Sequence, residues 1–248
     1  MSLIKTPDEI KIIKQGGKIL AGILKELTEQ VEAGMSTMDL ENYAQELFKQ
    51  SGGSPSFQNY DGFPTATCIS VNDEVVHGIP RRNKIIKEGD IVGIDVGLKY
   101  KGLFTDTAVT VPIGKIDKER KKLLKITQEA LNIAILKAKP GNFIGDIGQA
   151  VQNYVEKNGY SVVRSLVGHG VGHEVHEAPR VPNFGEVGTG ELLREGMVLA
   201  LEPMVNIGTY DIIIKKDGWT IATADGSLSA HFEHTVAITK NGARILTK

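Results

Sequence analysis

The chain has 248 residues, of which 41% are hydrophobic, so it can bury one sizeable core or two small ones. Its 29 Lys and Arg residues against 30 Asp and Glu leave no net field that would favour nucleic acid or an anionic membrane. The N-terminal segment lacks an apolar stretch after a basic one, and nowhere do eighteen apolar residues run together, so we expect neither secretion nor a membrane span. A single cysteine, Cys68, excludes an internal disulfide framework and a thiolate zinc cluster, which fits a cytoplasmic protein.

The first half of the chain begins with two predicted helices. The stretch 6–9, Thr-Pro-Asp-Glu, combines an N-cap, a proline at the first helical position and a capping-box glutamate. This start predicts a helix that runs to about Val31. Its Gly16-Gly17 pair either weakens the helix or lets another backbone approach closely. A second helix is predicted from about Ser36 to the glycines at 52 and 53.

The second half repeats this pattern. Asp117 is the predicted cap of a long helix to about Lys139, and a further helix should follow Pro140-Gly141 and end at Gly159. Five positions of the first half match five of the second at a constant offset of 107: Gly34, Asp39, Leu40, Gln45 and Gly52 correspond to Gly141, Asp146, Ile147, Gln152 and Gly159. We therefore expect a single catalytic domain over residues 1–248, built by internal duplication of approximately 1–112 and 113–248, with a site between the halves.

Strand-like runs are the remaining structural signal. They are predicted at 65–71, 90–97, 104–112, 161–166, 197–201, 212–215, 219–224 and 231–239. Because the helices are segregated from the hairpins, the pattern favours an α+β fold over a doubly wound parallel sheet.

Two of these strands carry carboxylates within apolar surroundings. Asp95 lies in the run 91–96 and Asp106 precedes Val109 and Val111. The positions 95 and 106 sum to 201, as do 98 and 103, so a hairpin turning over residues 99–102 would set the two aspartates directly opposite each other on one face. Like charges so placed are destabilising unless a cation neutralises them, and no Lys or Arg lies within the two strand segments. A solvent-facing strand face with two unrelated acids is the alternative interpretation.

The six histidines fall in three short stretches. These contain His77 in VVHGIP, then His169, His173 and His176 in GHGVGHEVHEAP, then His231 and His234 in AHFEHTVAI. Such grouping indicates metal ligation or acid–base chemistry near neutral pH. We interpret His173, His231 and His234 individually as hydrogen-bonded surface histidines.

Two glutamates also lie in apolar strand contexts, Glu202 in VLALEPMV and Glu233 in AHFEHTVAI. A salt-bridged structural role is the alternative for either one. With Asp95, Asp106 and His169 they form an oxygen-rich set that suits Mn, Fe(II), Co or Zn. Four carboxylates exceed what one divalent ion needs, so the set predicts two metal ions.

Other catalytic motifs are not supported. The run 173–176 is one residue short of the H-E-x-x-H zincin helix, and the glycines of 168–172 match neither a dinucleotide-binding loop nor a P-loop. The chain also lacks a G-x-S-x-G elbow for a serine nucleophile.

Taken together, the aspartate pair eleven residues apart, GHGVGH, LEP and HFEHT resemble the methionine aminopeptidases, specifically the short bacterial type I form without an N-terminal extension. The resemblance covers the whole chain. It implies a pita-bread fold with two pseudo-twofold-related halves of a helix pair plus sheet. It also implies a cytoplasmic metalloexopeptidase that removes the initiator methionine from nascent chains near the ribosome when the second residue is small. We expect a monomer with no membrane or specific nucleic-acid partner.

The resemblance also implies roles for individual residues. A dimetal site would comprise Asp95, Asp106, His169, Glu202 and Glu233. Water bridged by the two metals would attack the scissile carbonyl with Glu202 as proton shuttle, while His77 and His176 contact the scissile peptide. The methionine pocket and substrate contacts would be formed by Phe57, Tyr60, Phe63, Cys68, His77, Val175, His176 and Trp219. The best-known bacterial relatives carry different residues at the positions of Phe57, Phe63 and Val175.

Two alternative functions are considered. A prolidase or aminopeptidase P would use the same metal ligands, but such enzymes normally carry a large extra N-terminal domain that 248 residues cannot hold. A non-catalytic peptide-binding module on this fold would be expected to have lost at least one carboxylate, and none is missing.

Overall fold

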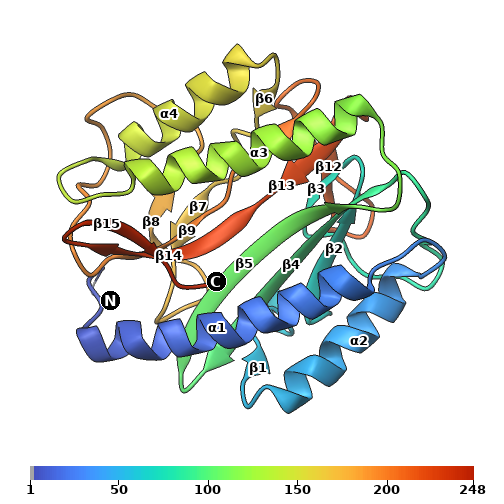
Figure 1. The fold of residues 1–248 in the computed structure, drawn as a ribbon, viewed down its shortest axis with the longest axis horizontal. Helices are drawn as coiled ribbons and strands as arrows, with labels where there is room; N and C mark the ends of the chain where they lie inside the picture. Colours follow the sequence, from blue (N-terminus) through green and yellow to red (C-terminus); the bar gives the residue numbers. More distant parts are fainter. Residues whose placement is uncertain (1–2) are drawn as a thin grey trace.

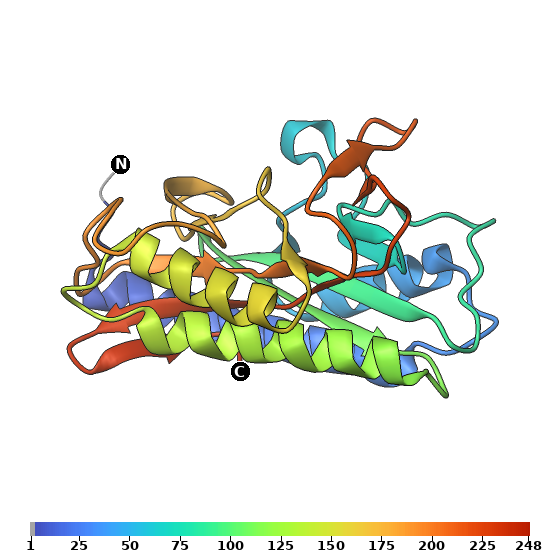
Figure 2. The ribbon, with the colours of Figure 1, turned by 90° about the horizontal axis from the view of Figure 1, so that it is seen from above.

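The computed structural model describes residues 3–248, and Met1 and Ser2 lie outside the described residues. Four helices lie along one side of a curved sheet, with loops and short strands projecting from the opposite side (Figures 1 and 2). The helices are α1 (Pro7–Gln30), α2 (Thr37–Gln50), α3 (Lys118–Lys137) and α4 (Ile144–Lys157). All four were predicted from their caps, and each bound agrees to within about two residues. Within residues 3–248 no helix is long and apolar enough to cross a membrane.

The main sheet has nine strands. They are β1 (Ser54–Pro55), β2 (Thr67–Val71), β4 (Ile91–Tyr100), β5 (Leu103–Pro112), β7 (Gly168–Gly170), β8 (Glu177–Val181), β9 (Val198–Leu201), β14 (Glu233–Thr239) and β15 (Gly242–Ile245). The strand order is β1-β4-β5-β14-β9-β7-β8, with β2 paired to β4 and β15 paired to β14. The strands of each half therefore meet where β5 pairs with β14.

Two smaller sheets and a short helix complete the fold. One sheet contains β6 (Ser161–Val162), β10 (Met204–Asn206) and β13 (Ser229–His231), and the other contains β3 (Glu74–Val76), β11 (Ile212–Ile214) and β12 (Ile221–Thr223). A single 3-10 turn, η1, covers Tyr60–Gly62. The separation of helices from antiparallel strands confirms the predicted α+β class.

Each half has its own hydrophobic core beneath its helix pair. Leu20 and Leu27 of α1 are fully buried in the first core, and Leu123 of α3 and Val151 of α4 are fully buried in the second. The stripes that bury these side chains follow helical periodicity, so the helices are held against the sheet by apolar burial.

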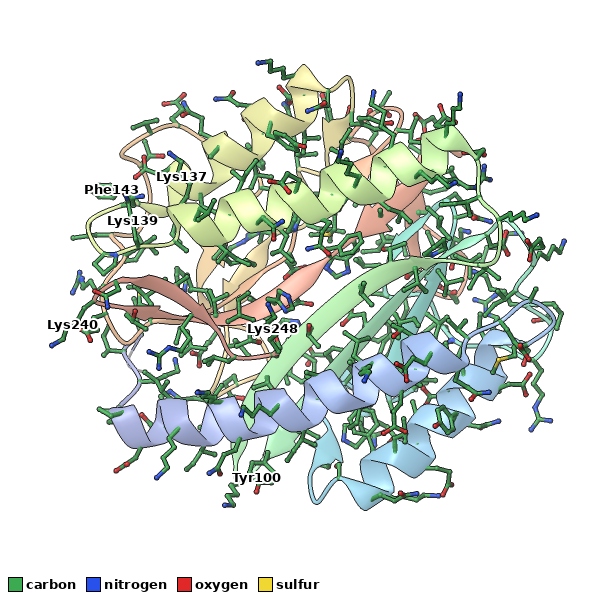
Figure 3. The ribbon with its side chains drawn as sticks, viewed as in Figure 1. Tyr100, Lys137, Lys139, Phe143, Lys240 and Lys248 are labelled. Carbon is green, nitrogen blue, oxygen red and sulfur yellow. The ribbon has the colours of Figure 1, made fainter. Side chains whose placement is uncertain are left out.

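The offset of 107 recurs in the structure. The bounds of α2 and α4 differ by 107 at both ends. The N-cap Ser36 bridges Ile85, while Phe143, labelled at the turn between α3 and α4 in Figure 3, bridges Leu192 at the same offset. Gly34 and Gly141 both have positive φ, 99° and 87°. These correspondences support our proposal that the domain arose by duplication, with halves dividing near residues 112 and 113.

The register of the β4–β5 hairpin differs from the prediction. Tyr100 pairs with Leu103, and the two-residue turn of Lys101 and Gly102 has φ of 49° and 85°. Positive φ at both turn residues gives a tight turn whose twist matches the right-handed twist of the strands. The strands therefore stay paired further toward the turn than they would with a four-residue turn. Asp95 consequently faces Ala108, with Asp106 displaced by two positions. The prediction that the two aspartates lie directly opposite each other is wrong, and they are diagonal neighbours on the same face.

The Gly16-Gly17 pair serves close packing. A Cβ atom on Gly17 would lie 2.4 Å from the carbonyl oxygen of Leu246, and one on Gly16 would lie 3.1 Å from Cβ of Tyr100. The second of the two predicted roles is therefore confirmed, because α1 packs directly on the C-terminal backbone and the hairpin.

Several short strands were missed or mispredicted. The strand predicted over 161–166 is reduced to β6, and the run 231–239 is divided between β13 and β14 at Phe232. β1, β3, β7, β8, β10 and β15 were not predicted. β7 is Gly-His-Gly, which has low strand propensity and is ordered by its neighbours β8 and β9.

Candidate metal centre and adjoining cavity

A cavity of about 220 Å³ collects side chains from both halves of the chain. Its lining residues are Phe57, Tyr60, Asp61, Phe63, Cys68, Val76, His77, Asp95, Asp106, His169, His176, Glu202, Trp219, His231 and Glu233. The structure therefore brings together all the sequence-predicted site residues except Val175. That side chain is 2% exposed and belongs to the same buried cluster as Phe57, Phe63 and Cys68.

Five adjacent strands position the acidic end of the cavity. Asp95 lies on β4, Asp106 on β5, Glu233 at the start of β14, Glu202 directly after β9 and His169 on β7. The sheet order places these strands side by side, and alternation directs the side chains to one face. Ligand atoms approach within 4.8 Å of one another in three groups: Asp95, Asp106 and Glu233; His169, Glu202 and Glu233; and Asp106, His169 and His176.

The four carboxylates lack compensating charge. Burial raises the pKa of Asp95 to about 7. Burial and mutual repulsion raise the pKa values of the other three carboxyl groups well above their usual range; these are Asp106, Glu202 and Glu233. No lysine or arginine is among the described residues that line the cavity. In the absence of a cation, the cluster can relieve its repulsion only by holding protons.

The donor set fits divalent metal ions. Three buried carboxylate oxygens, Asp95 Oδ1, Asp106 Oδ1 and Glu233 Oε1, have no hydrogen-bond partner among the described residues. Buried acceptors without partners are costly, and cations that prefer oxygen ligands with one imidazole would satisfy them.

His169 is oriented as a ligand. Its Nδ1 lies 2.9 Å from the carbonyl oxygen of Gly170, so an Nδ1 proton donated there leaves Nε2 free. Nε2 is 3.4 Å from Oε1 of Glu202. Burial lowers the pKa of His169 to about 3, which keeps the imidazole neutral and able to bind a metal.

Two further imidazoles stand beside this group. The His176 ring lies 4.4 Å from the His169 ring and 5.2 Å from the Tyr60 ring, both in edge-to-face geometry. Burial lowers the pKa of His176, and burial together with the nearby His176 lowers the pKa of His77 to about 4. Both rings are neutral near pH 7, so each can donate one hydrogen bond and accept another.

His231 is a cavity residue that the sequence reasoning missed. It is 4% exposed, and its Nε2 lies 3.7 Å from Glu202 Oε2 and 4.0 Å from Glu233 Oε2. This nitrogen is also without a hydrogen-bond partner among the described residues. The interpretation as a surface histidine is wrong, since residues 231 and 233 of this extended segment point to the same side. The spacing of two residues between His231 and Glu233 was the sequence signal that could have placed His231 in the cavity.

The other two histidines interpreted as structural lie outside the cavity lining. His173 Nε2 is 2.8 Å from Glu9 Oε1, and His234 Nδ1 is 3.0 Å from the Thr247 hydroxyl. Both are hydrogen-bonded and partly buried rather than fully exposed. Asp61 and Val76 also line the cavity and carried no distinguishing pattern in the sequence.

The opposite end of the cavity is apolar and aromatic. The Phe63 and Trp219 rings meet edge to face at 5.3 Å, and Phe57 and Cys68 complete the buried wall. Gly97 lies against this wall, where a Cβ atom would come within 2.7 Å of the Phe57 ring. An elongated apolar side chain could therefore be enclosed next to the acidic cluster.

Comparison with known proteins identifies the family of this arrangement. The sequence profile of metallopeptidase family M24 matches residues 11–240. The chain belongs to this family. Membership of family M24 implies that this chain is a hydrolase with a divalent metal cofactor.

Several members of family M24 that match nearly the whole chain are named methionine aminopeptidase. The chain is 49% identical over 247 residues to that of Clostridium perfringens, covering 100% of this chain and 99% of the relative. It is 46% identical to methionine aminopeptidase 1 of Bacillus subtilis, with 100% of both chains covered. The crystal structure of the Thermotoga maritima methionine aminopeptidase superposes with a TM-score of 0.97 at 50% identity, covering 99% of this chain and 98% of that one. The chain is thus a metallopeptidase of the methionine aminopeptidase type.

The fold is shared more widely within the family. Prolidase from Pyrococcus furiosus superposes with a TM-score of 0.82 at 28% identity, and the match covers 99% of this chain but 65% of the prolidase. The expected pita-bread fold with its two related halves is confirmed by these neighbours.

Proposed function

We propose that the chain hydrolytically removes the N-terminal methionine from nascent proteins whose second residue is small. The observation that carries this proposal is the cavity in which four clustered carboxylates, three of them with unpaired buried oxygens, adjoin an aromatic pocket. The acidic end supplies a metal site, and the aromatic end selects one side chain. The full-length similarity to methionine aminopeptidases supports the same activity.

Two divalent ions, of Co, Mn, Fe(II) or Zn, would be held by Asp95, Asp106, His169, Glu202 and Glu233. Four carboxylates against one neutral imidazole balance the charge of two such ions, which supports two rather than one. When bound, such ions acidify water and polarise the scissile carbonyl.

Glu202 is the proposed base that takes the proton of the attacking water and returns it to the leaving amine. Its position follows β9 directly, and its backbone carbonyl accepts a hydrogen bond of 3.0 Å from the buried Asn183 side chain. This bond fixes the segment from which the carboxylate projects.

The two imidazoles His77 and His176 are the proposed contacts to the scissile peptide. Neutral imidazole can donate to the carbonyl oxygen as negative charge develops there, or accept from a peptide N–H. Both line the cavity; His176 lies beside His169 and Tyr60, and the His77 ring lies 6.5 Å from the Phe63 ring, which supports this role.

Selection for methionine is proposed to reside in the aromatic end. Tyr60, Phe63 and Trp219, which line the cavity, are proposed to enclose the thioether, which gains sulfur–aromatic contacts of about 0.3–1.5 kcal/mol. Norleucine at the first position should therefore be cleaved appreciably, and isoleucine hardly at all, because its β-branch adds bulk near the backbone. Equal rates for the two would contradict the pocket assignment.

The cellular context follows from the proposed substrate. N-terminal methionine is presented by newly made chains, so we propose action in the cytoplasm near the ribosome, as a monomer, with no nucleic-acid specificity of its own. The near balance of 29 basic and 30 acidic residues is consistent with that absence of specificity.

The test is cleavage of matched tripeptides by protein purified anaerobically, with its metal content measured by elemental analysis. Met-Ala-Ser should be hydrolysed well, and Leu-Ala-Ser and Ala-Pro-Ala poorly. The structural similarity to prolidase makes Ala-Pro-Ala the relevant competitor. A preference for Ala-Pro-Ala would overturn the proposal, and so would metal-loaded protein that cleaves none of the three.

A further inference from the structure

The two halves of the main sheet meet at a short ladder between β5 and β14. Within residues 3–248 its register partners are Glu233 with Ala108 and His234 with Thr107. Buried backbone groups beyond such a short ladder need other partners, because leaving them unpaired is costly. At each end of this ladder a threonine hydroxyl takes the place of a strand partner.

Thr235 holds both backbone groups of Asp106. The Asp106 N–H donates to Thr235 Oγ1 at 2.9 Å, and the Thr235 hydroxyl donates to the Asp106 carbonyl oxygen at 2.7 Å. Both residues are buried, with exposed fractions of 0% for Thr235 and 4% for Asp106. A single side chain thus fixes this backbone position and the direction in which the carboxylate leaves it.

Thr110 makes the same pair of bonds to His231. The His231 N–H donates to Thr110 Oγ1 at 2.9 Å, and the Thr110 hydroxyl donates to the His231 carbonyl oxygen at 2.8 Å. Thr110 is also buried. In both cases two residues more than one hundred positions apart in the chain are joined by a reciprocal clamp.

The two clamps are related by the internal repeat. Thr110 lies opposite Gly93 on β4, and Thr235 lies opposite Ala200 on β9. Positions 93 and 200 differ by the 107 residues that relate the halves. Thr110 and Thr235 therefore occupy equivalent positions, and each reaches across the boundary to the other half.

We propose that Thr235 is a positioning residue for metal binding, acting through Asp106, and that Thr110 is its counterpart acting through His231. The proposal rests on the proposed function, in which Asp106 is a metal ligand and His231 is not. Groups that orient a metal ligand typically change metal affinity 10–100-fold when removed. The equivalent clamp on His231 makes the same hydrogen bonds but should affect metal affinity less, because His231 is not a proposed ligand and lies 3.7 Å from Glu202 and 4.0 Å from Glu233.

This pairing provides a matched control. If the clamps only hold the sheet together, Thr235→Val and Thr110→Val lose the same two bonds and should have the same consequences. If Thr235 positions a ligand, the two variants should have similar melting temperatures and different metal affinities. Thr235→Ser keeps the hydroxyl and should restore the affinity.

The experiment is titration of Mn(II) into metal-stripped full-length protein by isothermal calorimetry, together with melting curves of the stripped variants. Thr235→Val should bind Mn(II) roughly 10–100-fold more weakly than wild type, Thr110→Val should lose less, and Thr235→Ser should keep wild-type affinity. Wild-type affinity in Thr235→Val, or an equal loss in both valine variants, would overturn the proposal. If Thr235→Val does not fold, weakened binding in Thr235→Ser still contradicts it.

The outcome is separable from that of the proposed function. Mn(II) titration uses no peptide, so a wild-type protein that binds Mn(II) but does not cleave Met-Ala-Ser would refute the function and leave the clamp standing. An active wild-type enzyme with indistinguishable valine variants would refute the clamp alone.

Discussion

Replacing Asp95 by Asn should stabilise the metal-free protein near neutral pH. Burial raises the pKa of Asp95 from 3.8 to about 7. Between these values the folded chain retains a proton that the unfolded chain has released, so the stability contributed by this group falls as the pH rises through the window. At ~1.36 kcal/mol for each pKa unit, the difference corresponds to about 4 kcal/mol that the Asp95→Asn variant avoids.

The assay is thermal unfolding in EDTA between pH 4.5 and 8. For a chain of this size 1 kcal/mol moves the melting temperature by roughly 2–4 °C, so the variant should exceed wild type by about 8–16 °C at pH 8 and by little at pH 4.5. With saturating Mn(II) the order should reverse, because wild type gains the binding energy of a complete ligand set.

Asp61→Asn is the matched control for this experiment. Asp61 lines the same cavity but is exposed, and asparagine tolerates its left-handed φ of 49°. This variant should melt as wild type does at every pH. Parallel pH profiles for wild type and Asp95→Asn in EDTA would refute the argument that burial penalises the ionised form of Asp95.

Three further substitutions, two of them with a matched control variant, test the remaining parts of the site and fold. His176→Ala should keep Mn(II) binding but lower kcat on Met-Ala-Ser roughly 10²–10³-fold, as expected for loss of one oxyanion donor. The control His173→Ala should retain activity. Loss of the metals in His176→Ala would contradict a role for His176 as an oxyanion donor. Gly97→Ala places a Cβ atom 2.0 Å from Ser56 Oγ and 2.7 Å from the Phe57 ring, so kcat/KM for Met-Ala-Ser should fall about tenfold or more with Mn(II) affinity retained. An unchanged kcat/KM would show that the pocket wall can shift freely. In urea unfolding, Gly17→Ala should lower the free energy of unfolding by about 1–3 kcal/mol, because its Cβ atom would collide with Leu246. Gly22→Ala in the same helix, whose Cβ atom would meet no atom within 4 Å, should raise it by about 0.5–1 kcal/mol. A change of the same sign in both variants would contradict the packing argument.

The helices could be predicted from the sequence because their signals are local. The capping box between Thr6 and Glu9 and that between Ser36 and Asp39 are both formed, with backbone-to-carboxylate hydrogen bonds of 2.7 and 2.8 Å. Strands such as β7 depend instead on neighbours distant in the chain. The three residues Gly168–Gly170 have no alternation of their own, so the strand that carries His169 could not be predicted from them.

The hairpin shows why an error in register left the candidate site intact. The turn at Lys101 and Gly102 shifts the pairing by two positions relative to the prediction. Side chains alternate with a period of two, so an even shift keeps Asp95 and Asp106 on the same face, whereas a shift of one would have separated them. The prediction of a shared face therefore did not require the correct turn.

The internal repeat offers a physical reason why this cavity needs an external cation. Asp95 and Glu202 differ by 107 positions, and β4 and β9 begin at positions that differ by the same number. A duplicated fold brings equivalent positions together at its boundary, so an acid retained in both halves meets another acid rather than a basic partner. Neither half then supplies a Lys or Arg to the described lining of the cavity. Charge balance must come from bound ions or protons. When metal is removed, the raised pKa values of the four carboxyl groups mean that the cluster binds protons instead.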